Sequence, residues 1–447
     1  MNFSSKEFSI IFYACTLLLY ACNTLISQSI PYEFYISKSQ KRHFDAGEDW
    51  NVLSIFGPFR YQQLNKLEKN NTFYIKPRLG VISRNKSNQL YGYGHFIYKK
   101  YYYGYNYSSI ALSSNINNNN LGNMSGLGYE NSWVMLQIGK GTESWGAGNN
   151  IQLALHQDSN PYDYFMLGSD YGKIRVRYIH GIIDGTEDNI NRYVVARGLE
   201  WSNKYSLIIG FSETIIYSGI NRQMDLGYMN PISSHLEVDF NDRSNVPGGQ
   251  HANAVWQFHY DWLPFKRTRL SLNYLIDEFV LDSDIELGKE HREAYSLRLC
   301  ITPIYLSKHV FSIFTSMINI DKKTFRHNNG YNNFVHGGIP IGYPSGSDTK
   351  DYTFGMNYFN QKNLLFSILL GQNQSGDENI TKKVFEPIYT GYSVSNSINT
   401  HFYIKSYLQW WFKPNIILTL STELKSNGIK SKEVVHFIKL DTYFSII

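Results

Sequence analysis

The sequence predicts an all-β protein, an antiparallel transmembrane β-barrel of about 16 to 18 strands that follows a short N-terminal periplasmic or plug segment. Three observations predict this class. Many segments alternate between apolar and polar residues, and aromatic residues make up 16% of the chain. Beyond the leader, no segment is apolar for the ~18 residues that a membrane-spanning helix needs. A closed barrel is the other structure that satisfies every backbone polar group inside a bilayer.

The composition excludes several other classes. The chain has 447 residues, a length that suits one large barrel. Its mean hydropathy of −0.34 is too low for a helical membrane protein. The net charge of +5 comes without a block of basic residues, so nucleic acid is not an expected partner. A soluble β-sandwich, jelly roll or propeller is the alternative, but apolar faces that end in Trp and Tyr favour a barrel.

Residues 1–29 are interpreted as a signal peptide. Lys6 precedes the apolar run Phe8–Cys22, and Ser27–Ser29 offers small residues for cleavage. The run Leu19–Cys22 is an imperfect lipobox, so lipidation at Cys22 is the alternative to cleavage near Ser29. Export followed by a barrel indicates the bacterial outer membrane.

Residues 30–71 differ from the rest of the chain. Ser37–Glu48 is charged, Trp50–Phe59 is apolar, and Tyr61–Asn71 is compatible with one or two helical turns. We interpret the segment as a periplasmic piece or a plug for the lumen. A first barrel strand is the competing interpretation.

Residues 72–447 are expected to form the barrel, and the segment 254–262 shows the alternation most clearly. Its aromatic and apolar residues share one face, while Val255, Gln257, His259 and Asp261 share the other. The segments 269–276, 295–302 and 401–412 repeat the pattern. Cys300 lies in one of these segments, and no intrachain disulfide is expected because the other two cysteines belong to the leader.

Connections of two lengths separate these segments. Short turns are expected at 264–266, 360–363 and 413–415. Longer polar loops are expected at the four ranges 115–129, 239–251, 321–349 and 372–383. Outer-membrane barrels have short turns on the periplasmic side and long loops outside the cell, so the pattern also predicts an orientation.

Several short motifs follow one another in the middle of the chain. They are Trp145–Asn150 (WGAGNN), Asp158–Pro161 (DSNP), Ile209–Tyr217 (IGFSETIIY) and Leu226–Pro231 (LGYMNP). Over about residues 130–265 their order resembles the capsule-assembly Wzi family, particularly its Bacteroidetes-type members. The resemblance implies an outer-membrane barrel that binds capsular or extracellular polysaccharide and helps to assemble or retain it on the cell surface.

The candidate site residues each have a structural alternative. Gly146 and Gly148 indicate a turn or bulge in which side chains do not fit. Four charged residues are placed on inward polar faces, where they would fix a plug, meet an acidic glycan or form a structural ion-pair ladder: Arg175, Arg177, Arg197 and Glu213. Two aromatic residues would stack on sugar rings or belong to an interfacial girdle: Trp145 and Tyr217. Three polar residues would bind hydroxyl groups or set turns: Asn149, Asn150 and Asp158.

The sequence predicts no enzyme. It contains neither a Gly-x-Ser-x-Gly elbow nor a His-Glu-x-x-His motif, and its paired glycines are not followed by the lysine and helix of a phosphate loop. Catalytic residues, cofactors and metal ligands are therefore not assigned. The expected partners are surface polysaccharide, outer-membrane lipid and lipopolysaccharide, and the barrel-assembly machinery during biogenesis. A porin-like channel for sugars or other small solutes is the alternative function.

Overall fold

A computed structural model describes residues 73–443, except for gaps at 86, 100, 113–122, 186–188, 204, 231–251, 279–291, 307–308, 329, 361–362, 389–397, 414–415 and 428–430. The expected signal peptide at 1–29 and the expected periplasmic or plug segment at 30–71 lie outside the described residues. No helix in the described part is long and apolar enough to cross a membrane.

Eighteen strands form one sheet, and two more form a small hairpin. The first ten strands of the sheet are β1 (Phe73–Arg84), β2 (Ser87–Tyr98), β3 (Tyr102–Ala111), β4 (Met124–Glu130), β5 (Val134–Gly141), β6 (Tyr162–Asp170), β7 (Ile174–Ile183), β8 (Ile190–Ser202), β9 (Leu207–Ile220) and β10 (Asn253–Phe265). The other eight are β11 (Thr268–Glu278), β12 (Arg292–Tyr305), β13 (Val310–Ile320), β16 (Thr349–Phe359), β17 (Leu364–Ser375), β18 (Asn399–Lys413), β19 (Ile416–Asn427) and β20 (Ser431–Tyr443). The hairpin is β14 (Val335–His336) with β15 (Ile339–Pro340), and two short 3₁₀ helices are η3 (Leu226–Met229) and η5 (Gly330–Asn332).

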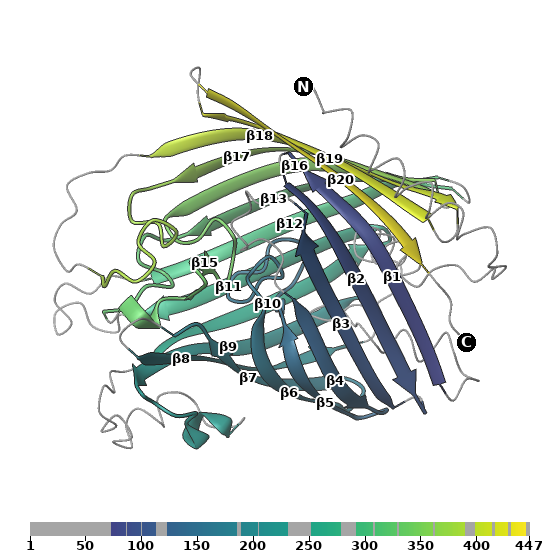
Figure 1. Ribbon diagram of the computed structural model, residues 1–447. Coiled ribbons are helices and arrows are strands. Elements are labelled where there is room, and N and C mark those ends of the chain that lie inside the picture. The colour runs from purple at the N-terminus through teal and green to yellow at the C-terminus, as the bar shows by residue number, and fades with distance from the viewer. Residues whose placement is uncertain are drawn as a thin grey trace.

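The large sheet closes into a barrel (Figure 1). Each strand pairs antiparallel with the next along the chain, and β13 passes to β16 because β14 and β15 belong to the connection between them. The seam joins β1 to β20, with Arg78–Arg84 opposite Phe437–Tyr443. The 18 strands confirm the predicted all-β barrel and lie at the upper end of the predicted strand number.

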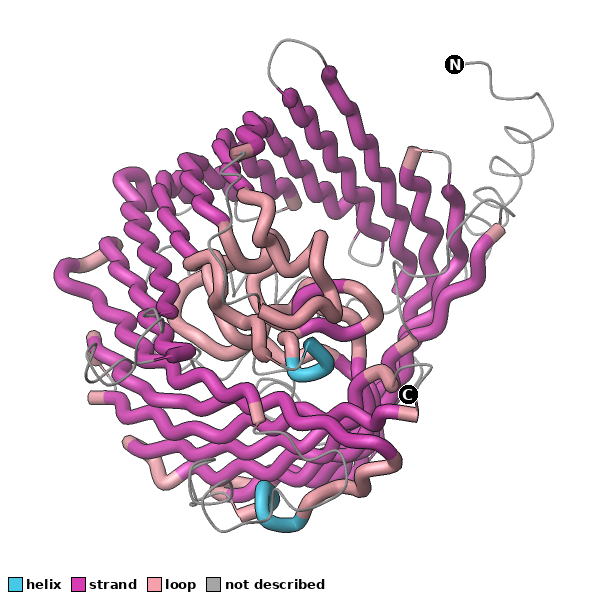
Figure 2. The backbone as a smooth tube through the Cα atoms, turned by 90° about the vertical axis from the view of Figure 1, so that its left-hand side faces the viewer, coloured by secondary structure: helices cyan, strands magenta, loops and turns pink. Residues whose placement is uncertain are grey.

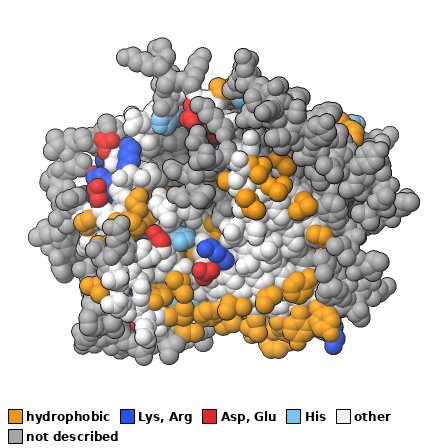
Figure 3. All heavy atoms as spheres, viewed as in Figure 1, with side chains coloured by type: hydrophobic (Ala, Val, Ile, Leu, Met, Phe, Trp, Pro, Cys, Tyr) orange, Lys and Arg blue, Asp and Glu red, His pale blue; other side chains and the backbone are white. Residues whose placement is uncertain are grey.

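The two faces of the wall differ as the alternation predicted. On β10, Val255, Gln257 and His259 are buried toward the lumen, while Phe258 and Trp262 are exposed on the outside. Exposed apolar side chains recur on the outer faces of most strands, and Figure 3 shows them as a band across the lower part of the face it presents. An apolar outside and a polar inside are typical of a barrel that lies in a membrane.

Connections at the two ends of the barrel differ in length. At the short-turn end, no more than four residues join β2 to β3, β6 to β7 or β8 to β9. At the long-loop end, residues 142–161 join β5 to β6, and residues 321–348 join β13 to β16. Figure 2 shows loops folded inside the ring of strands, so part of this chain length fills the barrel.

Candidate functional site

Residues 142–161 turn into the lumen, where wall side chains hold their backbone. The Ala147 N–H donates to Asn273 Oδ1 at 2.7 Å, and Asn273 Nδ2 donates to the Ala147 carbonyl at 3.0 Å. Gln257 Oε1 accepts a hydrogen bond from the Ala154 N–H at 3.0 Å. Buried amides that satisfy backbone groups in this way fix one loop conformation, because each unpaired group would be costly.

The glycines of the WGAGNN motif allow this loop to turn. Gly146 and Gly148 have φ angles of +142° and +79°, and a Cβ on Gly148 would lie 2.7 Å from Ile151 Cδ1. The expectation of a turn without room for side chains is confirmed. The turn lies in a loop inside the barrel, however, and not in the barrel wall.

Residues 321–348 form a second internal loop, anchored by a buried arginine of β8. Arg192 Nη2 donates to the Asn333 carbonyl at 2.7 Å, and its Nη1 lies 2.9 Å from Asp184 Oδ1. Asp184 also interacts with His336 Nδ1 at 3.0 Å. Burial alone would raise the pKa of Asp184, but the hydrogen bond with His336 and the charge of Arg192 outweigh it and lower the pKa.

Residues 376–388, which follow β17, form the third internal segment. Asn379 Nδ2 donates to the carbonyls of Ser345 and Ser347 at 2.7 and 2.6 Å. Glu378 accepts hydrogen bonds from Arg326 and Lys383. We refer to residues 142–161, 321–348 and 376–388 together as the plug.

The plug has an apolar core that is continuous with the lumen side of the wall. Its buried residues from the three plug segments are Trp145, Ala147, Ile151, Leu153, Ala154, Leu155, Phe325, Phe334, Val335, Ile341, Tyr343 and Ile380. They pack against residues of β6 to β13, including Ile179, Val194 and Val255. Each fully buried Leu, Val or Phe stabilises the packed state by roughly 1.5–3 kcal/mol. The plug is therefore a folded part of the barrel on this side.

On the other side, a pocket separates the plug from the wall. This lumen pocket has a volume of about 640 Å³. The plug contributes Asn149, Asn150, His156, Asp158, Tyr343, Pro344 and Ser345 to its lining. The wall contributes Arg298, Phe314, Ser316, Ile318, Asp351, Thr353, Asn357, Ser367, Leu369, Asn373, His401, Tyr403, Lys405, Glu423, Lys425 and Glu433.

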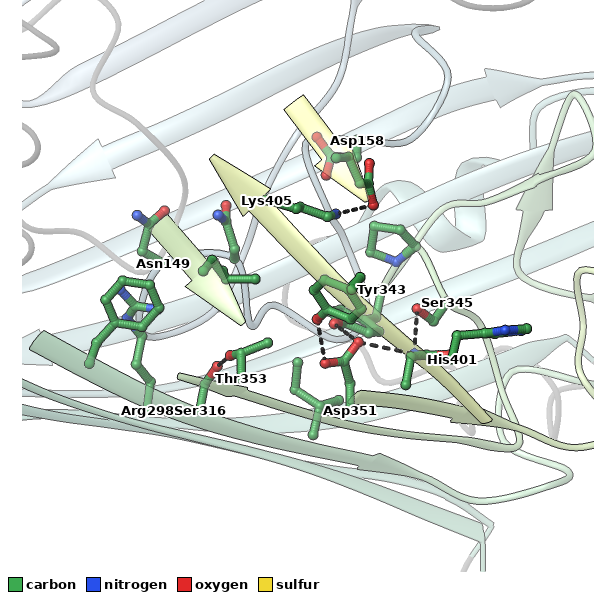
Figure 4. A pocket seen from close by; sticks show the side chains of 18 of the residues that line it. Asn149, Asp158, Arg298, Ser316, Tyr343, Ser345, Asp351, Thr353, His401 and Lys405 are labelled. Carbon is green, nitrogen blue, oxygen red and sulfur yellow. Dashed lines mark hydrogen bonds and ion pairs between the residues drawn. The ribbon is translucent and has the colours of Figure 1, made fainter. Parts of the chain in front are cut away.

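Asp351 of β16 ties the plug to the wall at this pocket (Figure 4). Its carboxylate accepts hydrogen bonds from Tyr343 Oη at 3.1 Å, Tyr403 Oη at 2.8 Å and Asn373 Nδ2 at 3.0 Å. Burial, and then the charge of Asp351, raise the pKa of Tyr343 well above its usual value, so this tyrosine stays a neutral donor.

The rest of the pocket mixes charged and aromatic groups. Lys405 Nζ lies 3.2 Å from Glu423 Oε1, and the Arg298 guanidinium lies 3.7 Å from the centre of the Phe314 ring. Burial lowers the pKa of His156, and the nearby Asp158 opposes this effect only in part, so the imidazole is neutral near pH 7. Ring faces beside several hydrogen-bonding groups suit a hydroxyl-rich ligand better than an apolar one.

Six of the nine predicted site residues lie inside the barrel. Asn149, Asn150 and Asp158 line the lumen pocket. Arg175 pairs with Asp170 and Glu200 on the lumen wall at 3.0 and 3.1 Å, as the ion-pair alternative predicted. Arg177 shares that face of β7. Trp145 is 1% exposed in the plug core, so in this structure it offers no surface for stacking on a sugar.

The other three residues do not face the lumen: the inward position expected for Arg197 and Glu213 is wrong, and Tyr217, for which a girdle was the alternative to sugar stacking, also lies on the outer side. Arg197, Glu213 and Tyr217 point to the outside of the barrel, because they alternate with Ala196 and Ile216, which pack in the plug core. Residues 222–230 cover part of the outer wall here, so both faces are buried over Arg192–Arg197 of β8 and Ser212–Gly219 of β9. Polarity therefore does not distinguish the two faces of these strands.

Sequence reasoning missed the wall side of the lumen pocket. Asp351, Tyr403, Lys405 and Glu423 come from three strands, and none belongs to a recognisable motif. The available signal was the polar face of 401–412, on which Tyr403 and Lys405 alternate with apolar residues. A metal site is not indicated either, because the described residues contain no group of three or more His, Cys, Asp or Glu placed to hold an ion.

No protein-family model matches the chain, and no curated protein matches it. Among solved structures, the fold is similar to Wzi of Escherichia coli, described as an outer-membrane protein involved in group 1 capsule assembly and a carbohydrate-binding β-barrel. The TM-score is 0.61 at 11% identity, over 86% of this chain and 87% of Wzi. OpdL of Pseudomonas aeruginosa has a TM-score of 0.49 at 9% identity, over 84% and 99% of the two chains. The Wzi likeness establishes the fold of an outer-membrane β-barrel.

Proposed function

We propose that this protein binds capsular or extracellular polysaccharide at the outer membrane and helps to assemble or retain it on the cell surface. The lumen pocket carries the proposal. It combines polar, charged and aromatic side chains beside a folded plug, and it lies in the half of the barrel toward the long-loop end. In outer-membrane barrels that end faces the cell exterior, where surface polysaccharide is found.

The pocket is preformed, which supports binding. The Asp351 carboxylate of the wall accepts hydrogen bonds from Tyr343 of the plug and from Tyr403 of the wall, so it holds one tyrosine on each side of the boundary. A saccharide would meet side chains that are already ordered, so binding loses less conformational entropy. Wzi, which has a similar fold, is described as carbohydrate-binding, and this agrees with the proposal. The proposal includes no catalytic step.

A porin-like channel for sugars or other small solutes is the second candidate. The lumen pocket runs along the wall beside the plug, and its wall residues extend over the strands from β12 to β20. A pocket against the wall is where a continuous water path past the plug would run. The two functions differ in whether ions cross the protein.

A bulky residue in the pocket tests the binding site. Leu369 lines the pocket, and its neighbour Ile368 faces the outside of the same strand. Leu369→Trp should weaken polysaccharide binding at least about tenfold, the effect of losing about 1.4 kcal/mol. Ile368→Trp is the matched control and should bind like the unchanged protein. Equal binding by both variants would place the glycan elsewhere.

Conductance separates the two candidates. The refolded protein is placed in a planar bilayer, and current is recorded before and after addition of purified surface polysaccharide from the same cells. We expect no steady conductance, together with binding of the glycan to the reconstituted protein. A steady conductance that sugars block reversibly would reject the binding role and identify a channel.

A further inference from the structure

The lumen pocket is deep and follows the strands of the wall. Asp351 and Asn373 lie opposite each other near the long-loop end, whereas Asn357 and Ser367 lie opposite each other nearer the short turns. On β16, Asp351 and Asn357 are about 20 Å apart along the strand, since each residue advances the strand by ~3.3 Å. Thr353, between them on the same strand, faces the same space (Figure 4). The pocket therefore has a distinct upper end and a distinct lower end.

The upper end of the pocket is open to solvent. Lys405 and Lys425 line it, and their side chains are 49% and 46% exposed. Lys425 and the exposed Glu433 lie close to the turn between β19 and β20, at the long-loop end of the barrel. In outer-membrane barrels this end faces the cell exterior, so a ligand enters the pocket from outside the cell.

The wall directly below the pocket is apolar. Phe359 and Leu365 lie opposite each other, and they are the next inward positions below Asn357 and Ser367. They pack with inward-facing residues of the neighbouring strands, and each of these side chains is no more than 5% exposed. The cluster, which we call the apolar floor, consists of Val310, Phe359, Leu365, Trp411 and Ile417.

An apolar inner face is unusual, because the interior of a membrane barrel is normally polar. Apolar constrictions in channels exclude water and thereby stop ions. At the level of the floor, Gln409 lies opposite Leu365 and Thr419 lies opposite Gln409, and both polar side chains are buried. The described wall below the pocket therefore offers a polysaccharide chain no way toward the periplasm.

The size of the pocket limits how a polymer can occupy it. Its volume of about 640 Å³ is within the range of roughly 300–1,000 Å³ that is typical of pockets for one small ligand. Such a volume holds a few sugar units of a single strand, but not a strand that enters and turns back. A polymer bound in its middle would need either a second opening or room for the returning strand.

We propose that the lumen pocket is closed at its lower end and binds the end of a polysaccharide chain, a conclusion that rests on the polysaccharide binding proposed above. A terminal sugar has a free hydroxyl group where an internal sugar has a glycosidic bond. Asn357 and Ser367 place an amide and a hydroxyl group just above the floor, with Ser367 Oγ 2.6 Å from Asn357 Oδ1. Groups of this kind can hydrogen-bond a terminal hydroxyl that reaches the bottom of the pocket.

The number of protein molecules bound to each polysaccharide chain tests this proposal. Surface polysaccharide from the same cells is separated into long and short chains, and the detergent-solubilised full-length protein is added to each until binding saturates. Analytical ultracentrifugation then gives the number of proteins per polysaccharide chain. We expect the same number for long and short chains, because each chain has the same ends whatever its length. A number that rises with chain length would overturn binding at the end while leaving the proposed function intact. Absence of binding to both preparations would reject the proposed function, and end binding with it.

Ion conductance tests the apolar floor separately. The double substitution Phe359→Ala, Leu365→Ala shortens two floor residues, and Tyr358→Ala, Phe366→Ala is the matched control on the outer faces of the same two strands. We expect a steady conductance in planar bilayers from the floor variant, and none from the unchanged protein or the control. A conducting unchanged protein, or a floor variant that folds by circular dichroism and does not conduct, would show that the floor is not what closes the pocket. The count of proteins per polysaccharide chain uses the unchanged protein, so it decides the proposal even where the floor variant fails to fold.

Discussion

At the scale of single residues, two glycines of the plug allow the cost of a left-handed backbone to be measured separately from the cost of a steric clash. Gly148 and Gly338 have similar φ angles of +79° and +76°, but only at Gly148 would a Cβ meet other atoms within 4 Å. Gly338→Ala should cost about 1–2 kcal/mol of stability, from the left-handed backbone alone. Gly148→Ala should cost about 1–3 kcal/mol more, because Ile151 must move. Denaturant unfolding of the detergent-solubilised protein measures the free energy of unfolding of both variants. Equal losses of this free energy in the two variants would contradict the tight packing at Gly148.

Glu378 gives the plug an acid-sensitive contact. Burial alone would raise its pKa, but hydrogen bonds from Lys383 and Arg326 outweigh burial and lower the pKa below the ordinary 4.5. Because the folded pKa is depressed, the contact stabilises the plug above about pH 4.5 and is lost as the pH falls through the folded value.

The matching prediction concerns Glu378→Gln. The variant should melt at a lower temperature than the unchanged protein at neutral pH, and the difference should shrink as the pH falls below 4.5 and through the lowered pKa of Glu378, where the carboxylate becomes protonated. Thermal melting measured across this range tests the prediction. A difference between the two proteins that does not vary with pH would show that the carboxylate charge is not what holds this segment.

At the scale of elements, Asn273 of β11 connects the wall to the first plug loop. It is fully buried and bonds both the N–H and the carbonyl of Ala147. Asn273→Ala leaves these two backbone groups unpaired, at a cost of about 1–3 kcal/mol for each. We expect residues 142–161 to loosen and transient conductance to appear in planar bilayers. Thr315→Ala, on the exposed outer face of β13, is the control, and the same conductance in both variants would contradict the anchoring role.

The strands show how far alternation predicts structure. On β10, β11 and β12 one face of each strand contacts the plug and the polar lumen, while the other face is exposed on the outside of the barrel. The inward and outward faces of these strands could therefore be predicted from the sequence. On β8 and β9 both faces are covered over the residues 192–197 and 212–219, and Arg192 and Arg197 point to opposite sides. The plug itself could not be predicted, because its bonds join residues as far apart in the chain as Ala147 and Asn273.

At the scale of the whole molecule, the register at the seam can be tested by cross-linking. Ser83 of β1 lies opposite Ile438 of β20, and both face outward. Directly opposed Cβ atoms are about 4.5–5.5 Å apart, close enough for a disulfide. The pair Ser83→Cys, Ile438→Cys should form a disulfide on mild oxidation. The pair Ser83→Cys, Val434→Cys is out of register and should not; cross-linking of both pairs would contradict the seam.

The plug also bears on the order in which the barrel can assemble. Residues 142–161 are held by Gln257, Asn273 and Ser296, which belong to strands that come later in the chain. The plug core touches β6 to β13 and leaves the seam strands β1 and β20 free of it. The interior can therefore form first and act as a template for the curvature of the wall. Insertion into the membrane would then end when β1 pairs with β20, after β1 has paired with β2 and β20 with β19.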